Sequence, residues 1–343
     1  MSLPEQITLA QGSGGAAMAE LIETLFKPAF ANPYLNEGED QARLPMSDFM
    51  QAGDRLAITT DSYVISPLQF PGGDIGKLAV CGTLNDLAVG GAQPKFLSLS
   101  LIIEEGLPLA LLRTLVQSMQ QTAAAEQVAI VTGDTKVVPR GSADQLFINT
   151  TGIGIIPDNR DLSSRRIQVG DALLVNGYVG NHGAAIADLR ESLGFHSSLQ
   201  SDCAPLSPLI ERVLSECDGV RCIRDATRGG LAAVANEFAT ASGRHLELQE
   251  PALPIHESVA AICELLGYDP LYLANEGNAL WVVDGAVKDK VVNLMRTHPL
   301  GQNAACVGTV VAEHQRGWVT AKNALGSSRM VDLPMGELLP RIC

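Results

Sequence analysis

Residues 75–104 read IGKLAVCGTLNDLAVGGAQPKFLSLSLIIE, and they place an apolar helix pattern directly before an apolar strand pattern. Ile75–Val89 is rich in Ala, Leu and Val and predicts a helix. Lys95–Glu104 is rich in β-branched and apolar residues and predicts a strand. A helix that runs straight into a strand is typical of layered proteins in which helices cover a sheet.

The alternation of strands and helices continues on both sides of this stretch. On the N-terminal side, residues 16–30 predict a helix with one apolar face, and Leu56–Val64 predicts a strand. On the C-terminal side, the chain predicts a helix at Pro108–Gln127 and strands at Val128–Val138 and Gln145–Ile156. Pro157–Gly170 is rich in Asp, Arg and Ser and is the best linker candidate.

A second unit of the same kind follows the linker. It begins with a strand at Asp171–Val175 and a helix from about Ala184. Further strands are predicted at Val220–Ile223, His245–Gln249, Ala279–Val283, Ala305–Val311 and Trp318–Ala321. The fold class is therefore α/β (α+β), with two domains of mixed sheets covered by helices.

The predicted organisation has four parts. A Gly-rich loop and helix occupy residues 1–40, a first domain 41–157, a second domain 168–322, and a C-terminal tail 323–343. A flexible tail of about 20 residues could cross a small domain or an oligomer interface. It ends in Pro340-Arg341-Ile342-Cys343. A terminal thiol on such a tail could enter a cleft, although an incidental surface cysteine would look the same in sequence.

Composition excludes several classes of function. The 343 residues are 46% hydrophobic, with a mean hydropathy of +0.14, which indicates a well-buried globular protein. The net charge of −14 argues against a nucleic-acid binder. No apolar run is long enough to span a membrane, and the first residues lack a signal segment. Seven Cys without a CxxC pair indicate reduced thiols and a cytoplasmic protein.

Four aspartates lie at positions that favour a role in binding. Asp61 follows the strand-like run 56–60, Asp86 lies inside an apolar helix, and Asp134 and Asp225 follow apolar runs. Each one alone could simply cap a turn or helix. A buried Asp in an apolar helix is costly unless it is paired or metal-bound. Together the four predict a Mg²⁺ site that carries a nucleotide triphosphate such as ATP.

Other residues could complete such a site. Two Gly-rich stretches, residues 12–15 and 229–230, could present backbone N–H groups to phosphates. Neither stretch matches the P-loop motif or the dinucleotide-binding fingerprint. Lys136 and Glu276 are acid/base candidates, although Glu276 could be a solvated turn residue. His182 could touch phosphate or serve only hydrogen bonds. The candidate nucleotide contacts are Gly12, Ser13, Gly14, Gly15, Thr135, Lys136, His182, Thr227, Gly229 and Gly230.

Seven stretches together resemble one family over essentially the whole chain. They are Gly12-Ser13-Gly14-Gly15, Thr60-Asp61-Ser62-Tyr63-Val64, Asn85-Asp86, Gly133-Asp134-Thr135-Lys136, Asp225-Ala226-Thr227-Arg228-Gly229-Gly230, Ala274-Asn275-Glu276-Gly277 and the terminal Pro340-Arg341-Ile342-Cys343. The chain resembles the carbamoyl dehydratases of hydrogenase maturation, within the aminoimidazole-ribonucleotide-synthetase (PurM-like) superfamily. The Asp motifs are typical of the superfamily, and the terminal tetrapeptide singles out this branch.

The resemblance implies a two-domain PurM-like architecture and a homodimer joined through the N-terminal domains, with ATP near the interface. It implies that the carbamoyltransferase HypF carbamoylates Cys343. The enzyme would then use ATP to dehydrate that thiocarbamate to a thiocyanate. The cyano group would pass to the HypC–HypD complex for the iron site of [NiFe]-hydrogenase. Glu276, with Lys136, would act in proton removal, and Asp61, Asp86, Asp134 and Asp225 would hold Mg²⁺.

Two departures and two alternatives accompany this interpretation. Members of the family often carry His where this chain has Gln11, and Asp where it has Asn181.

A superfamily enzyme acting on a small molecule, such as selenophosphate synthetase or thiamine-phosphate kinase, is the first alternative. Residues 6–18 contain no reactive Cys or Lys for the former, and the latter has no use for a terminal Cys. The second alternative is a non-catalytic nucleotide-binding scaffold.

Overall fold

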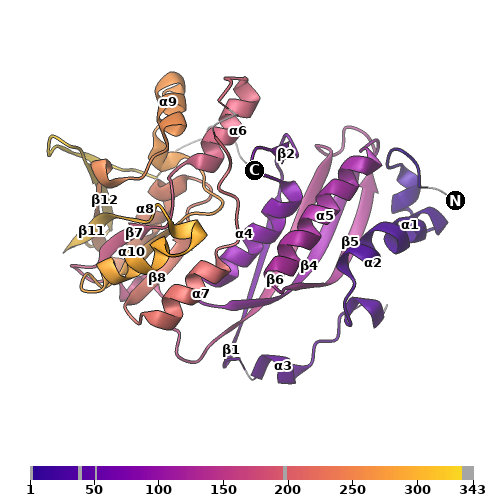
Figure 1. Ribbon diagram of the computed structural model, residues 1–343, viewed down its shortest axis with the longest axis horizontal. Coiled ribbons are helices and arrows are strands. Elements are labelled where there is room, and N and C mark those ends of the chain that lie inside the picture. Colours follow the sequence, from indigo (N-terminus) through magenta and orange to yellow (C-terminus); the bar gives the residue numbers. More distant parts are fainter. Residues whose placement is uncertain (1–2, 38–40, 51, 196–198, 334–343) are drawn as a thin grey trace.

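The computed structural model describes residues 3–37, 41–50, 52–195 and 199–333. They form two α/β units side by side, with the N-terminal half on the right of Figure 1 and the C-terminal half on the left. Among the described helices, none combines the length and the apolar character needed to cross a bilayer.

The N-terminal unit is built on a four-stranded sheet in the order β1-β6-β4-β5. Strand β6 runs antiparallel to both β1 and β4, and β5 is parallel to β4. Helices α4 and α5 cover one face of this sheet (Figure 1). The bounds are β1 Arg55–Tyr63, α4 Ile75–Val89, β4 Gln93–Glu104, α5 Leu109–Ala125, β5 Ala129–Val138 and β6 Leu146–Ile156.

Smaller elements surround this sheet. The helical stretch predicted at 16–30 is present, but its middle turn is a π-helix that joins α1 to α2. The bounds are η1 Leu9–Gly12, α1 Ala16–Leu21, η2 Ile22–Phe26, α2 Lys27–Phe30, η3 Leu35–Glu37, α3 Met46–Met50, β2 Gln69–Phe70 and β3 Gly73–Asp74.

The C-terminal unit contains a seven-stranded sheet in the order β13-β12-β9-β11-β7-β10-β8. The central strands β7 Ala172–Val175 and β10 Ala279–Val283 are buried along their whole length. Helix α8 packs against one face of the sheet, and α7 and α10 pack against the other. Covering both faces explains why these strands appear in the sequence as continuous apolar runs rather than alternating ones.

The remaining elements of this unit follow the predicted alternation with shifted ends. Helix α6 begins at Asn181 rather than near Ala184, because Gly180 adopts a left-handed conformation just before it. The bounds are η4 Ser164–Arg166, α6 Asn181–Glu191, α7 Ser207–Glu216, β8 Val220–Asp225, α8 Gly230–Ser242, β9 Arg244–Gln249, η5 Glu250–Ala252, α9 Glu257–Leu266, η6 Pro270–Tyr272, α10 Lys288–Arg296, η7 Pro299–Gly301, β11 Ala305–Glu313, β12 Trp318–Lys322 and β13 Ser328–Met330.

The predicted tail starts later than Asn323. Strand β13 pairs with β12, Val331 is fully buried, and the Val331 N–H donates to the Val319 carbonyl at 2.9 Å. The prediction of a tail beginning at 323 is therefore wrong for residues up to Leu333. The prediction failed because a strand of three residues and one buried apolar residue are enough to extend the edge of a sheet. A segment this short shows no periodic pattern in the sequence. Cys343 lies outside the described residues.

Helix α4 joins the two units. It packs against α5 and β1 in its own unit and against α7 and β8 in the other. Its Ala88 and Val89 belong to the same hydrophobic cluster as Leu174 and Trp281 of the second sheet. A helix that is apolar on all sides is expected to be buried on all sides, and the polar residues on it therefore need partners.

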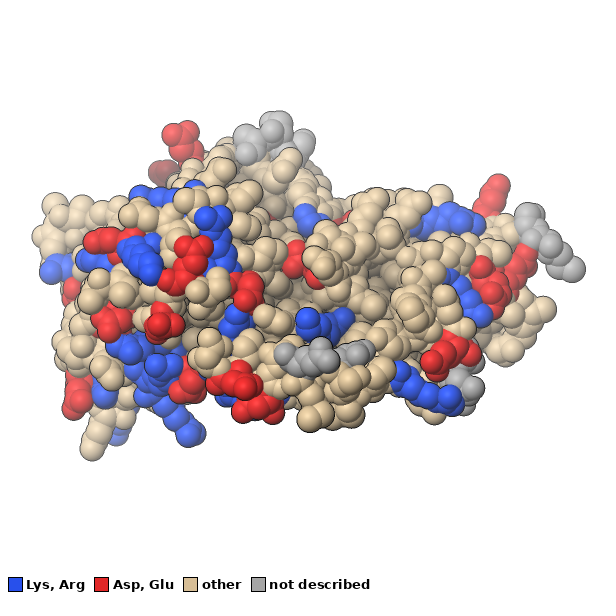
Figure 2. Space-filling view, turned by 60° about the horizontal axis from the view of Figure 1, so that its bottom comes forward, with Lys and Arg blue, Asp and Glu red and all other residues tan. Residues whose placement is uncertain are grey.

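The cysteines are packing residues in the part of the chain that the structure describes. Cys81, Cys203, Cys217, Cys222 and Cys263 are buried, Cys306 is half-buried, and all six are free thiols. Charged side chains of both signs are intermixed on the face shown in Figure 2, where the described residues form no continuous basic stripe. The surface agrees with the acidic composition of the chain.

Candidate functional site

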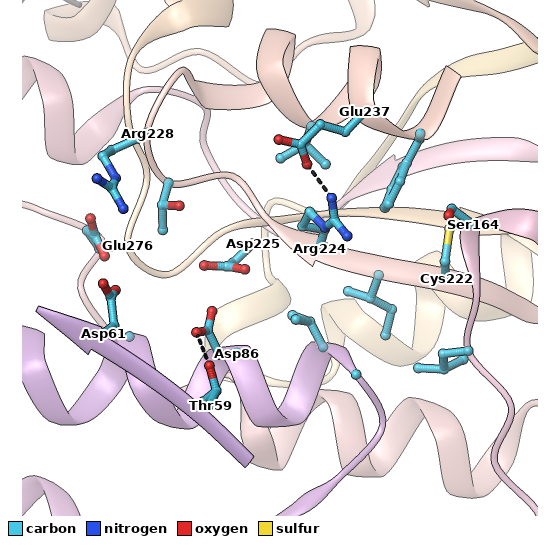
Figure 3. A pocket seen from close by; sticks show the side chains of 18 of the residues that line it. Thr59, Asp61, Asp86, Ser164, Cys222, Arg224, Asp225, Arg228, Glu237 and Glu276 are labelled. Atoms are coloured by element: carbon cyan, nitrogen blue, oxygen red, sulfur yellow. Dashed lines mark hydrogen bonds and ion pairs between the residues drawn. The ribbon is translucent and has the colours of Figure 1, made fainter. Parts of the chain in front are cut away.

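A cavity of about 770 Å³ opens between the two units. Its walls come from β1, α4, β8, the middle of α8 and the segment 162–164 between the units. Figure 3 shows the carboxyl groups of Asp61, Asp86, Asp225 and Glu276 pointing into the same space. Three of the four predicted metal ligands and the predicted base thus line one cavity, although they are up to 215 positions apart in the chain.

The strand β1 places Asp61 in this cavity by its alternation. Residues Thr59, Asp61 and Tyr63 all line the cavity, so they lie on the face of the sheet that α4 covers. Strand β1 continues to Tyr63, so Asp61 lies inside the strand and not after it. The Thr59 hydroxyl donates to Asp86 Oδ2 at 2.8 Å and so ties β1 to α4 inside the site.

Glu276 is held in a turn that the surrounding chain fixes closely. It is 6% exposed and precedes β10. The neighbouring Asn275 is fully buried; its Oδ1 accepts from Gly180 N at 2.7 Å, and its Nδ2 donates to Ala226 O at 3.0 Å. These contacts fix the main chain beside Glu276, whose carboxyl group points into the cavity (Figure 3).

The acidic groups of the cavity have raised pKa values. Burial, and then the charge of Asp86, raise the pKa of Asp225 to about 7. Burial also raises the pKa of Asp86 and that of Glu276, in the second case with help from neighbouring Cys and Asp groups. Carboxyl groups that cannot all ionise together are typical of a site that gains a cation or a cationic ligand.

The donor set fits a Mg²⁺ ion that arrives with a nucleotide. Among the described residues, no group of three or more His, Cys, Asp or Glu side chains lies close enough together to hold a metal ion by itself. Mg²⁺ needs no such group, because one or two carboxylates plus substrate phosphates commonly hold it. Asp61, Asp86 and Asp225 would supply the carboxylates, and the cation would offset the repulsion among them.

Positive charge also reaches the cavity. Arg224 and Arg228 flank Asp225 in the sequence and line the same wall. Arg224 pairs with Glu237 and lies over the ring of Phe238, with 5.6 Å between the guanidinium carbon and the ring centroid. These arginines, Thr59 and Tyr63 were missed by the sequence analysis. The sequence did offer a signal for them. Arg224, Thr59 and Tyr63 lie within two residues of a predicted aspartate, and Arg228 lies within the motif 225–230.

Asp134 and Lys136 do not reach this cavity within one chain. The prediction that all four aspartates and Lys136 belong to one site is therefore wrong for a single chain. Strands β1 and β5 are the two edges of the sheet, three strand spacings or about 14 Å apart. Asp134 pairs with Ser100, Ser100 with Asn149, and Asn149 with Ser62. Directly paired residues share a face, so Asp134 lies on the face of Ser62, opposite to that of Asp61.

Asp134 and Lys136 form a second cluster on β5, and the first residue of the Gly-rich loop contacts the same strand. Both are exposed, and Lys136 Nζ lies 2.7 Å from Asp134 Oδ2, which lowers the pKa of Asp134. The loop 12–15 lies alongside, because Gly12 sits against Val137, where a β-carbon would come within 2.7 Å of that residue. Gln11, in place of the expected His, is buried and accepts from Thr8 N at 2.9 Å.

The remaining candidates divide between the cavity and the core. Thr227 lines the cavity, while Gly229 and Gly230 form the left-handed start of α8 beside it. Thr135 is buried in β5, and alternation places its side chain on the face opposite to Asp134 and Lys136. His182 does not line the cavity: it is fully buried, its Nδ1 lies 2.7 Å from Ser201 Oγ, and burial lowers its pKa to about 3.

Comparisons with known proteins give the same picture for the whole chain. The N-terminal domain of AIR synthase related proteins matches residues 38–156, and the C-terminal domain matches residues 168–319. Carbamoyl dehydratase HypE of Escherichia coli K12 is 53% identical over 98% of this chain and 99% of its own length.

Two solved structures are also similar over most of their length. A crystal structure of the hydrogenase maturation protein HypE in complex with ATP has a TM-score of 0.92 at 42% identity, and covers 98% of this chain and 99% of its own. A HypE–HypF complex has a TM-score of 0.78 at 42% identity, and covers 93% and 100% of the respective chains.

Proposed function

The chain belongs to the HypE carbamoyl dehydratases, a family of AIR synthase related proteins, and we propose that it dehydrates an S-carbamoyl group on its own Cys343 at the expense of ATP. The product is a thiocyanate that supplies the cyano ligand for the iron site of [NiFe]-hydrogenase. The observation that carries the proposal is the convergence of Asp61, Asp86, Asp225 and Glu276 in one nucleotide-sized cavity.

The proposed reaction balances as R–S–C(=O)–NH₂ + ATP → R–S–C≡N + ADP + phosphate. The amide oxygen attacks the γ-phosphorus, and the bond from that phosphorus to ADP breaks. The carbon–oxygen bond then breaks as phosphate leaves, and the nitrogen loses two protons. The elements of water are thus removed from the carboxamide, with the oxygen carried away on phosphate.

Residues of the cavity have distinct tasks in this scheme. Glu276 accepts the N–H protons, and burial raises its pKa above that of an ordinary carboxyl group, which makes it a stronger base. Asp61, Asp86 and Asp225 hold the Mg²⁺ that offsets phosphate charge. Arg224 and Arg228 line the same cavity and can approach phosphate oxygens. Burial of Glu276 keeps water away from a reactive phosphorylated intermediate.

Lys136 and the Gly-rich loop enter the scheme through a second subunit. Within one chain Asp134 and Lys136 lie on the far face of the sheet, so a homodimer joined through that face would bring the second cluster of one subunit toward the cavity of the other. Ile58 on this face is 74% exposed and Ile102 is 41% exposed. Apolar side chains exposed on a sheet support an interface there. Asp134 and Lys136 would then contribute to the phosphate site in trans.

The partners in this proposal are other maturation proteins. The solved HypE–HypF complex supports HypF as the carbamoyltransferase that loads Cys343. The HypC–HypD complex would accept the cyano group, and the free thiols suit the reducing cytoplasm.

Intact-protein mass spectrometry tests the function. The protein is incubated with the carbamoyltransferase, carbamoyl phosphate and ATP. We expect one carbamoyl adduct on the peptide that contains Cys343, followed by a species lighter by one water, and neither species in Cys343→Ala. An adduct absent from Cys343, with the transferase active on a control substrate, would contradict the proposal.

A further inference from the structure

Asp202 contacts the main chain of Glu276 from outside the cavity. Its Oδ1 accepts from Glu276 N at 3.1 Å, and its Oδ2 accepts from Gly277 N at 3.1 Å. Asp202 does not line the cavity. One carboxylate thus accepts hydrogen bonds from two successive backbone amides in the turn that carries the proposed base, Glu276. Hydrogen bonds from N–H groups to a carboxylate are stronger than those between neutral groups.

The two segments approach each other too closely for any larger residue. A β-carbon on Gly277 would lie 1.9 Å from the carbonyl oxygen of Asp202. This contact explains why Gly follows Glu276 in the motif 274–277.

Asn85 of α4 secures the same segment on the other side. It is 1% exposed, and its Nδ2 donates to Ala204 O at 3.1 Å and to Glu276 O at 3.3 Å. Its Oδ1 accepts from Leu206 N at 2.7 Å. The segment 202–206 is therefore hydrogen-bonded to α4, the helix that joins the two units. The turn at Glu276 is hydrogen-bonded both to this segment and to α4.

A carboxylate is a costly choice for this structural task. Burial raises the pKa of Asp202 to about 6, even though the backbone N–H groups of Glu276, Gly277 and His182 lower it. Asp202 also adds negative charge beside Glu276, where Cys203, Asp225 and Asp61 already face that carboxyl. An uncharged side chain would avoid this repulsion, so the presence of Asp is better explained by the site than by the fold.

We propose that Asp202 is a positioning residue that fixes the main chain of Glu276 and thereby aims its carboxylate into the cavity. Asp202 itself does not line the cavity, so its effect on the reaction passes through Glu276, which does. The inference rests on the proposed role of Glu276 as the base. Displacement of a reacting group by about 1 Å can cost about 10²-fold in rate.

The test is a kinetic double-mutant cycle on the full-length protein carrying S-carbamoyl Cys343. Single-turnover dehydration is followed by intact mass for the wild type, Asp202→Asn, Glu276→Gln and the double variant. We expect Asp202→Asn to slow dehydration by about 10²-fold, with an unchanged Kd for Mg-ATP by calorimetry. In the Glu276→Gln background the same substitution should have no further effect.

Hydrogen exchange supplies a direct readout of positioning. We expect the amides of Glu276 and Gly277 to exchange faster in Asp202→Asn than in wild type, because both lose a charged acceptor. Asp171→Asn is the matched control: that Asp is also buried and accepts from Gln168 N at 2.8 Å, but it lies outside the cavity and the turn. Its dehydration rate should stay at the wild-type value.

The outcomes separate this inference from the proposed function. A wild-type rate for Glu276→Gln overturns the role of Glu276 and this inference with it, while the chemistry at Cys343 stands on the mass shift alone. Equal rate losses for Asp202→Asn in both backgrounds overturn only the positioning role. If Asp202→Asn does not fold, the cycle is run with Asp202→Ser, and failure of both variants to fold assigns Asp202 to stability and overturns the inference.

Discussion

Asp61 and Asp134 lie on opposite faces and opposite edges of the same four-stranded sheet. In sequence both follow apolar runs, and both were predicted as ligands of one ion. The sheet separates them by about 14 Å and turns their side chains away from each other. One chain therefore carries two clusters, the cavity with Asp61 and the outer cluster with Asp134 and Lys136.

The separation of Lys136 from Glu276 predicts complementation between subunits. Lys136→Ala and Glu276→Gln are each expected to be inactive as homodimers. If the two residues act across an interface, mixing and reassociating the two variants restores one complete site in each heterodimer. Random mixing then recovers about a quarter of the wild-type sites, as half of the dimers are mixed and each has one intact site of two.

Single-turnover dehydration of the mixture, after reassociation, measures this recovery. The control is each variant put through the same procedure alone. A mixture with no recovered activity, in dimers shown to have exchanged subunits, would place both residues in one chain's site and contradict the proposed interface.

Asp86→Asn should weaken Mg-ATP binding. The substitution keeps the shape of the side chain and its contact with Thr59 but removes the charge that a bound cation needs. We expect a loss of about tenfold or more in affinity by titration calorimetry. Asp54→Asn is the matched control, since Asp54 is exposed and pairs with Arg55 at 3.0 Å. Equal affinities for wild type and Asp86→Asn would remove Asp86 from the metal set.

Asp225→Asn should stabilise the ligand-free protein at alkaline pH. The folded pKa of Asp225 is about 7, above its usual value of 3.8. Between these values the folded state binds more protons than the unfolded state, so the stability of the wild type falls as pH rises through this range. Partial exposure screens the effect to about 1–3 kcal/mol.

Chemical denaturation at pH 4 and pH 8 checks this linkage. The free energy of unfolding of Asp225→Asn should exceed that of the wild type at pH 8, and the two should converge toward pH 4. Addition of Mg-ATP should reverse the order at pH 8, because the wild type gains a bound ligand that the variant binds poorly. A difference that is the same at both pH values would mean that the carboxyl group is not destabilised in the fold.

Arg329 and Val331 should set the effective length of the tail. Arg329 pairs with Glu250 at 2.7 Å and with Asp269 at 2.5 Å, and the Tyr272 hydroxyl donates to Asp332 O at 3.0 Å. Release of residues 323–333 would about double the number of residues between the last residue held by the sheet and Cys343. Effective concentration falls roughly as the −3/2 power of length, so the double variant Arg329→Ala/Val331→Asp should dehydrate its own tail about threefold more slowly.

A carbamoylated tail peptide supplied in trans separates tethering from damage to the site. Its dehydration, with the variant's own Cys343 replaced by Ala, should proceed at the wild-type rate. Arg316→Ala, an exposed turn residue of the same unit, is the control for removal of a charge. Equal slowing of the peptide reaction would show that β13 supports the cavity rather than the tether.

The sequence by itself determined the order of the elements and the chemistry of the site. Apolar runs with helical or strand periodicity located most strands and helices. They could do so because the number of buried faces of an element determines which of its positions are apolar. Asp61, Asp86, Asp225 and Glu276 could be singled out since a carboxyl group beside an apolar run needs a partner.

Only the tertiary structure decided which of these residues meet. Register and sheet order put Asp134 and Lys136 on the face away from Asp61, and packing buried His182 in the core. The edge strand at Ser328–Met330 and the grip of Asp202 on Glu276 depend on contacts between segments tens to hundreds of residues apart. Such contacts leave no periodic signal along the chain, because they are fixed by the geometry of packing and not by local preference.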